Sequence, residues 1–297
     1  MQEQNRPLGF LILATATGFT ATAGMLLRWL DEPAQWRTIF YRALFFALTL
    51  IVWIAISRKG RLIEALRSIN AGGLLCALAF SISTICFIFA LFLTTVARTT
   101  FLNGLTPLLT GLLGWFVLRE RISPATWMAI FLALVGVSLM TSEDLTGGNL
   151  TGDVLALGSS VTTAAMYVLI RRARAIDMLP SFVVAAFMTA SLAAPWIEDF
   201  SISAHDLWIC AALGIFQLGF QYVLVTMGVR HLPAAEAALT TRLSLIFAPL
   251  FAWIGAGEVP GQATLIGGSV IVAAILLHGF WTLHGEARRA KLRPTGG

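Results

Sequence analysis

The chain has 297 residues, of which 58% are apolar and only 12% carry a charge. Soluble domains average about 25% charged residues, so fifteen acids and twenty bases are too few to cover a soluble protein of this length. The same composition excludes a disordered chain, which needs low hydrophobicity and high net charge. The composition therefore predicts an integral membrane protein, whose main solvent is lipid.

Apolar segments recur along the whole chain at the length that crosses the hydrocarbon core of a bilayer, about 20 residues. In chain order we predict ten membrane-spanning helices, at residues 8–27, 36–56, 72–93, 96–118, 124–141, 152–170, 180–197, 207–228, 232–255 and 262–281. The connections between them are short, so the fold class is all-α with no inserted soluble domain.

The basic residues are divided unevenly between alternate connections, which is the signal that orients membrane helices. With the N-terminus in the cytoplasm, fifteen bases lie in inner segments and only Arg28, Arg37 and Arg98 lie in outer ones. The outer connections instead hold acids such as Asp31 and Asp206. We therefore expect a multi-pass protein of a bacterial inner membrane with both termini in the cytoplasm, and we expect no nucleic-acid partner.

The second half of the sequence repeats the first. A shift of 138 residues aligns the fourth and fifth predicted spans with the ninth and tenth without a gap, and it pairs Trp115 with Trp253 and Glu120 with Glu258. A shift of 143 residues aligns the first span with the sixth. The sequence therefore predicts two repeats, residues 1–145 and residues 146–297, the second ending in a basic cytoplasmic tail.

Each predicted repeat has five spans, and because five is odd the two copies lie in opposite orientations. Inverted repeats are a recurrent design of secondary transporters. Two similar halves of opposite topology can exchange conformations, which makes the outward-open and inward-open states nearly equivalent. The architecture therefore favours transport over a purely structural bundle.

Several stretches carry a resemblance to a known family. They are Arg42-Ala43-Leu44 with Leu48, residues 97–107 with Trp115 and residues 118–122, and Leu232-Pro233-Ala234-Ala235 with Gly257-Glu258. Together they resemble the drug/metabolite transporter superfamily, specifically its EamA-type ten-helix members, over about residues 8–282.

The resemblance implies ten helices around a central cavity that is lined by the first, third, fourth, sixth, eighth and ninth helices among others. It also implies movement of small organic metabolites, often the export of amino acids or toxic compounds. One feature departs from the family, which often has Glu-Pro thirteen or fourteen residues before the second Glu. This chain has Ser244-Leu245 there and its proline at Pro249, which leaves open where the ninth helix is kinked.

Arg242 is the clearest candidate for a functional residue. It lies about ten residues into its span, which is roughly 15 Å along the helix and near the bilayer centre. A charge at that depth should face the interior of the bundle. We predict that Arg242 binds a carboxylate or other anionic group of the substrate. A fixed tie to helix-end carbonyls or to a buried acid is the alternative.

Uncharged polar and aromatic residues within spans are predicted to complete the substrate site. Asn103, Gln217 and Gln221 would supply hydrogen bonds, and the two glutamines lie four residues apart on one helical face. Tyr167 and Trp115 would stack on a flat substrate. Packing within the bundle or at the interface is the competing interpretation for both aromatic residues.

Three charged residues are predicted to serve gating or coupling. Arg42 lies about 10 Å below the outer face, where extension to the interface is possible. Because it falls on the family pattern, a structural or gating tie is favoured, with substrate contact as the alternative. Glu236 follows Pro233 near a helix N-terminus, where the helix dipole stabilises a carboxylate, and proton coupling is the alternative role. Arg98 lies near the outer mouth and is expected to extend its head towards the interface.

Two glutamates at the membrane edges, Glu120 and Glu258, are expected to cap or tie helices, with substrate contact as the alternative. The four histidines have no metal-ligand spacing, the three cysteines have no CxxC spacing, and the chain has no GxxxxGK[ST] motif. We therefore expect no metal, no cofactor and no ATP-driven chemistry.

The predicted function is alternating-access transport of an amino-acid-like or carboxylate-bearing metabolite, with export favoured over uptake. The expected partners are the small-molecule substrate and the lipid bilayer, while coupling to protons or an exchanged solute and a homodimer stay open. A non-transporting membrane sensor or scaffold is one alternative function. A membrane-embedded enzyme using Glu236 or Glu258 as acid or base is the other, although no nucleophile–base pair supports it.

Overall fold

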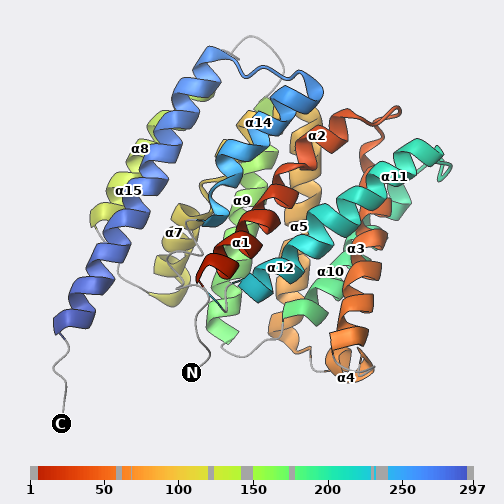
Figure 1. Ribbon diagram of the computed structural model, residues 1–297, viewed down its shortest axis with the longest axis horizontal. Helices are drawn as coiled ribbons and strands as arrows, with labels where there is room; N and C mark the ends of the chain where they lie inside the picture. Colours follow the sequence, from red (N-terminus) through yellow and green to blue (C-terminus); the bar gives the residue numbers. More distant parts are fainter. Residues whose placement is uncertain are drawn as a thin grey trace.

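A computed structural model of the protein describes residues 6–57, 62–67, 69–119, 124–141, 150–173, 178–228, 231 and 240–292. These residues are helical throughout, apart from short turns and connections (Figure 1). The helices are α1 (Arg6–Ala21), α2 (Ala23–Arg28), α3 (Gln35–Ser57), α4 (Leu62–Arg67), α5 (Ala71–Leu93), α6 (Val96–Asn103), α7 (Thr106–Leu118), α8 (Pro124–Thr141), α9 (Leu150–Ala173), α10 (Met178–Ala193), the 3₁₀ helix η2 (Ala194–Trp196), α11 (Ala204–Ala212), the π-helix η3 (Leu213–Phe220), α12 (Gln221–Gly228), α14 (Ser244–Ala256) and α15 (Gln262–Leu292).

Seven helical segments in the described ranges are long and apolar enough to cross a membrane. They are Pro7–Arg28, Gln35–Ser57, Ala71–Leu93, Val96–Leu118, Leu150–Ile170, Leu179–Trp196 and Ala204–Gly228. Three shorter apolar helices, Thr126–Leu139, Ser244–Ala256 and Gln262–Leu277, lie at the other three predicted spans. The all-helical, multi-pass membrane architecture that the composition predicts is therefore confirmed.

The surface of the bundle is apolar, in contrast to that of a soluble protein. Large side chains such as Leu11, Ile56, Phe116 and Ile254 are exposed. Such a surface is stable only against lipid, because contiguous exposed apolar area on a soluble monomer is otherwise limited to a few hundred Å².

The helices pack in pairs that are distant in sequence. α15 runs along α8, α10 along α3, α9 along α5, and α12 along α1 (Figure 1). Small residues allow the closest of these approaches. A Cβ added at Gly136 of α8 would lie 2.7 Å from the carbonyl oxygen of Gly267 in α15, so the two backbones are in contact, as is common for membrane helices.

One membrane helix is broken by a turn between α6 and α7, and a similar turn precedes α14. α6 ends at Asn103 and α7 begins at Thr106, with Gly104 and Leu105 in the turn between them. In the second half Arg242 and Leu243 form the turn, and α14 begins at Ser244. The shift of 138 residues superimposes one turn on the other.

The turn before α14 forms without the Glu-Pro pair that the family often has at this point. Pro107 lies at the start of α7, whereas the second half has Leu245 at that position and Pro249 inside α14. The turn before α14 therefore lies in register with the break between α6 and α7, without a proline at the equivalent position.

Candidate functional site

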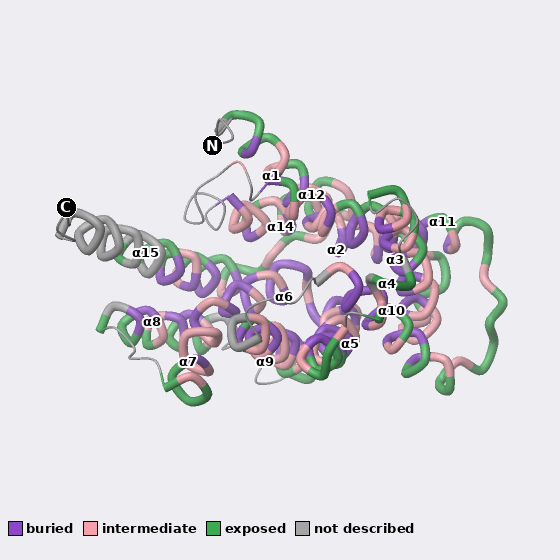
Figure 2. The backbone as a smooth tube through the Cα atoms, turned by 90° about the horizontal axis from the view of Figure 1, so that it is seen from below, coloured by how far each residue is buried: buried purple, intermediate pink, exposed green. Residues whose placement is uncertain are grey.

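A cavity of about 110 Å³ lies where the helix interruptions meet. It is enclosed by α1, α2, α5, α6 and α14, and α6 lies near the middle of the bundle with α14 on one side of it and α9 on the other (Figure 2). The polar side chains in its wall are Thr20, Thr100, Asn103, Arg242 and Ser244. Apolar groups, among them Phe87 and Leu245, supply the rest.

Arg242 contributes a positive charge to this cavity. It is half-buried in the turn that precedes α14, and no ion pair of its guanidinium is found in the described parts of the chain. Tyr167 on α9 lies within electrostatic range of Arg242, and its side chain is 45% exposed. A guanidinium in a largely apolar cavity is suited to bind a carboxylate through two parallel hydrogen bonds.

Asn103 lies in the same cavity wall and is held in position from two directions. Its Nδ2 donates to the carbonyl oxygen of Thr99 at 2.9 Å, and its Oδ1 accepts from Oγ of Ser160 at 3.3 Å. Ser160 is a buried residue of α9 and also lies 2.9 Å from the carbonyl oxygen of Leu102. The structure thus places Asn103 and Arg242, two of the predicted substrate ligands, in one cavity.

Gln217 and Gln221 are not among the residues that line this cavity. Gln217 is buried in η3 and accepts a hydrogen bond at 2.8 Å from Nη2 of Arg42, which is 2% exposed. Within the described residues, Nε and Nη1 of Arg42 have no hydrogen-bond partner. Arg42 therefore forms a buried tie between α3 and η3, and it does not extend to the interface.

The two glutamines are predicted to share one face of an α-helix, but they lie in two successive helical elements. Gln217 belongs to the π-helix, while Gln221 is half-buried at the first position of α12. A π-helix has i→i+5 hydrogen bonds and frequently occurs at functional sites.

Trp115 lies away from the cavity, against the prediction that it stacks on substrate. It is 41% exposed on α7, and its ring packs against Phe116 and Trp127 with centroid separations of 4.5 and 6.0 Å. Position in a span does not distinguish an inward-facing aromatic residue from one that faces lipid. Glu236 lies outside the described residues.

Arg98 is buried and paired, so the expectation that it extends to the interface is wrong. Its Nη2 lies 2.6 Å from Oδ2 of Asp153 on α9, and the two side chains are 5% and 3% exposed. Thr94 donates its hydroxyl to Oδ1 of Asp153 at 3.3 Å. Asp153 is not among the residues predicted for the site, although an acid within a predicted span is by itself a signal for an inward-facing partner.

Glu258 ties three segments together near the cavity, but the helices that it binds are α2 and α6 and not the tenth span that follows it. Its Oε2 lies 2.9 Å from Nε of Arg28, and its Oε1 accepts from the backbone N–H of Val96 at 2.6 Å. Arg28 also donates to the carbonyl oxygens of Leu91 and Thr94, at 2.7 and 3.0 Å. The pair thus satisfies backbone groups at the end of α5 and at the start of α6.

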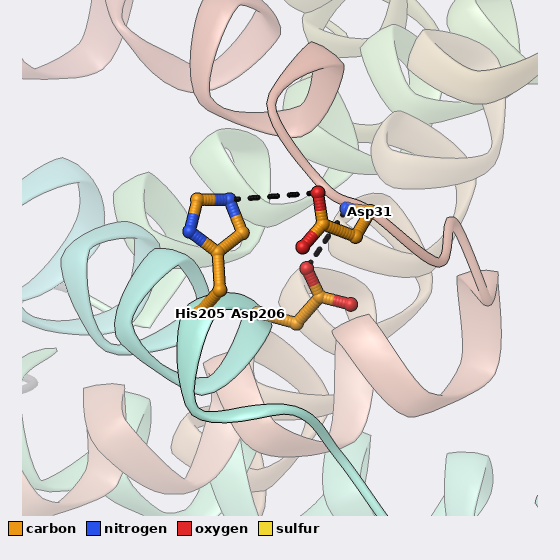
Figure 3. A group of neighbouring side chains, drawn as sticks. All are labelled: Asp31, His205 and Asp206. Carbon is orange, nitrogen blue, oxygen red and sulfur yellow. Dashed lines mark hydrogen bonds and ion pairs between the residues drawn. The ribbon is translucent and has the colours of Figure 1, made fainter.

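Asp31, His205 and Asp206 form a cluster at the same end of the bundle (Figure 3). Asp206 is buried, and its two carboxylate oxygens accept from the backbone N–H groups of Asp31 and Glu32 at 2.9 and 3.2 Å. Nε2 of His205 lies 3.0 Å from the carbonyl oxygen of Trp29. These bonds attach the connection after α2 to the start of α11.

Hydrogen bonding also sets the acidity of an exposed carboxyl group in the neighbouring connection. The hydroxyl and the backbone N–H of Ser201 both donate to Asp199 and hold the pKa of Asp199 below its ordinary value. This is a local turn interaction at the surface, outside the membrane-spanning helices.

Known proteins resemble this chain in both sequence and fold. The sequence pattern of the EamA-like transporter family matches residues 7–142 and again residues 150–280. The human protein named solute carrier family 35 member G1 is 26% identical over 60% of this chain, and the match spans 53% of that relative's length. The Pseudomonas aeruginosa protein named pseudopaline exporter CntI is 25% identical, and the match covers 80% of this chain and 84% of that protein.

A solved crystal structure shares the fold. Its TM-score is 0.66 at 18% sequence identity, and the superposition covers 92% of this chain and 98% of the other.

Proposed function

The chain belongs to the EamA-like transporter family, and from this premise we propose that it is a secondary transporter for a small carboxylate-bearing metabolite. The observation that carries this proposal is the cavity at the two corresponding helix interruptions, with Arg242 in its wall. In transporters built from repeats, interrupted helices at corresponding positions of the two halves point to the substrate site.

Several observations support ten spans arranged as two inverted five-helix repeats. The family pattern matches once in each half, and the two interruptions coincide after a shift of 138 residues. The packing has the matching symmetry. In two inverted repeats the first span corresponds to the sixth, and the third span corresponds to the eighth. The contact of α5 (third span) with α9 (sixth span) then corresponds to the contact of α12 (eighth span) with α1 (first span), and both contacts occur. Alternating access would then arise from an exchange of conformations between the halves.

The chemistry of the cavity favours a substrate with an anionic group and further polar groups. Arg242 would bind the carboxylate, while Asn103 and the hydroxyls of Thr100 and Ser244 lie in the same wall and would bind an amine or hydroxyl. An amino-acid-like metabolite has this combination. Since the similar Pseudomonas aeruginosa protein is named an exporter, export is the direction that we propose.

The distribution of bases supports the orientation. With fifteen Lys and Arg in the segments on the side of the termini and three in the others, the positive-inside rule places both termini in the cytoplasm of a bacterial cell. The end of the bundle that holds Arg28, Glu258 and Asp206 would then face outward.

A ligand screen followed by counterflow tests this proposal. The purified protein would be heated with amino acids, with other carboxylates and with the methyl esters of the same compounds, and the stabilising compounds would be tested for counterflow in proteoliposomes. We expect carboxylates to raise the unfolding temperature and to show counterflow, while their esters do neither. Stabilisation without counterflow would instead indicate a sensor. Stabilisation by esters and carboxylates alike would contradict the role of the anionic group.

A further inference from the structure

We propose that Arg28 and Glu258 form a latch that closes the outward end of the substrate cavity, and that the latch opens in each transport cycle. This inference rests on the proposed function, because a latch has a role only if the cavity opens alternately to the two sides. It assigns a gating role to two residues that touch no substrate.

The latch joins three segments that are separate in the sequence. Arg28 ends α2, Glu258 lies in the connection between α14 and α15, and both side chains hold backbone groups at the junction between α5 and α6. The ion pair itself measures 2.9 Å. Four interactions thus converge on one guanidinium and one carboxylate, so the loss of either side chain weakens the attachment of α2 to its neighbours.

The latch adjoins the cavity. Leu91 and Val96, whose backbone groups bind Arg28 and Glu258, are also part of the cavity wall. Next to them Gly24 of α2 packs against Val96 so closely that an added Cβ would lie 2.3 Å from Cγ2 of that valine. The ion pair therefore holds α2 tightly against the start of α6, beside the cavity.

A second contact fastens α2 to the end of α14. Nε1 of Trp29 donates to the carbonyl oxygen of Gly255 at 2.8 Å, and a Cβ added at Gly255 would lie 2.2 Å from Sδ of Met25. Because α2 and α14 both border the cavity, separating them would open it at this end.

The degree of burial distinguishes this latch from a permanent tie. The side chains of Arg28 and Glu258 are 28% and 16% exposed, whereas those of the neighbouring Arg98–Asp153 pair are 5% and 3% exposed. Water can replace the lost partner of a partly exposed ion at low cost, but separating a fully buried pair leaves an uncompensated charge. The backbone groups that the latch holds are helix-end groups, which water can also satisfy once the end is open.

The test uses cysteine labelling, which needs no substrate. In a background with Cys76, Cys86 and Cys210 replaced by Ala, Thr100→Cys places one thiol in the cavity wall. A membrane-impermeant maleimide is then added to intact cells. We expect Glu258→Gln and Arg28→Gln each to increase the labelling rate roughly tenfold, because a hydrogen bond to a charged group contributes about that factor to the closed state.

The matched control is Glu32→Gln. Glu32 is paired with Arg37 at the same end of the protein, but this ion pair does not join the segments that the latch holds together. We expect no change in labelling for this variant. The double variant Arg28→Gln/Glu258→Gln should label no faster than the single variants, because the two residues act as one unit. Fluorescence-detected gel filtration would confirm that each variant is folded.

Unchanged labelling in folded Glu258→Gln and Arg28→Gln, from either side of the membrane, would overturn the latch. Equal acceleration by Glu32→Gln would also overturn it. Acceleration seen only in inverted vesicles would support the latch and contradict the proposed orientation. Acceleration in intact cells without counterflow of any carboxylate would support the latch and contradict the proposed substrate.

Discussion

Thr106 and Ser244 lie 138 residues apart in the sequence and make the same hydrogen bond at the two helix interruptions. Oγ1 of Thr106 donates to the carbonyl oxygen of Asn103 at 2.7 Å, and Oγ of Ser244 donates to that of Thr241 at 3.0 Å. An interruption frees carbonyls from the helical ladder, and a freed carbonyl within a membrane is costly unless a partner replaces the lost donor. Both halves therefore use a side-chain hydroxyl three residues later to stabilise the turn.

Removing these hydroxyls should destabilise the interruptions. We expect Thr106→Ala and Ser244→Ala each to lower the free energy of unfolding by about 1 kcal/mol, the net contribution of a typical hydrogen bond. Denaturation of the purified protein in detergent measures this. Ser269→Ala is the control, because that hydroxyl bonds to Leu265 inside the continuous helix α15 and is exposed. An equal loss in all three variants would contradict a special role for the interruptions.

Gly104 should not tolerate even a methyl group. A Cβ there would lie 2.8 Å from Cδ2 of Leu245 and 2.9 Å from the carbonyl oxygen of Phe101. Since overpacking costs typically about 1–3 kcal/mol, we expect Gly104→Ala to lower the unfolding free energy by that amount. Gly18→Ala is the control, because nothing lies within 4 Å of its Cβ position. Equal stability of the two variants would show that the interruptions do not pack as described.

Most of the fold could be predicted because lipid imposes strict rules on sequence. Each membrane helix must satisfy its own backbone groups and be largely apolar over its length, so its position is visible as an apolar run. The break between α6 and α7 also has a local signal in Gly104 and Pro107. The corresponding turn at Arg242 has no such proline. In the sequence it can be located only by aligning the second half of the chain with the first.

The buried pair Arg98–Asp153 should behave as a unit. Breaking a buried ion pair from one side typically costs about 3–5 kcal/mol, because one charge stays buried without a partner. We therefore expect Asp153→Asn to destabilise the protein strongly, and we expect Arg98→Gln/Asp153→Asn to recover part of the loss. A double-mutant cycle of unfolding free energies measures this coupling. Additive losses would contradict it.

A substitution at the contact between Arg42 and Gln217 should stabilise the protein, in contrast to the substitutions above. Gln217 accepts one hydrogen bond from the guanidinium of Arg42 and supplies no countercharge. We expect Gln217→Glu to raise the unfolding temperature, because a carboxylate at that position compensates the buried charge. Gln217→Leu should lower the unfolding temperature. A lower unfolding temperature for the glutamate variant would show that Arg42 already has another anionic partner.

The candidate site was predictable only in part, because helical periodicity gives the face of a residue and not its neighbour. Arg242 was predictable from its depth in the membrane, since a charge there must face inward. Gln217 faces inward too, but its contact with Arg42 joins residues on different helices. The π-helix around Gln217 changes the direction of its side chain relative to a regular α-helix, and the composition of the sequence does not reveal a π-helix. Trp115 faces outward because lipid accepts an aromatic ring as readily as the core does.

Counterflow with variants of Arg242 tests the central claim most directly. Proteoliposomes containing the wild-type protein, Arg242→Ala, Arg242→Lys or the control Arg37→Ala, whose arginine lies outside the cavity wall, would be compared for the carboxylate that most stabilises the protein. We predict that Arg242→Ala reduces counterflow at least about tenfold and that Arg242→Lys gives an intermediate rate, because lysine keeps the charge but not the bidentate geometry. Arg37→Ala should be unchanged. Full counterflow by folded Arg242→Ala would contradict the assignment of the cavity at the helix interruptions as the site of an anionic substrate.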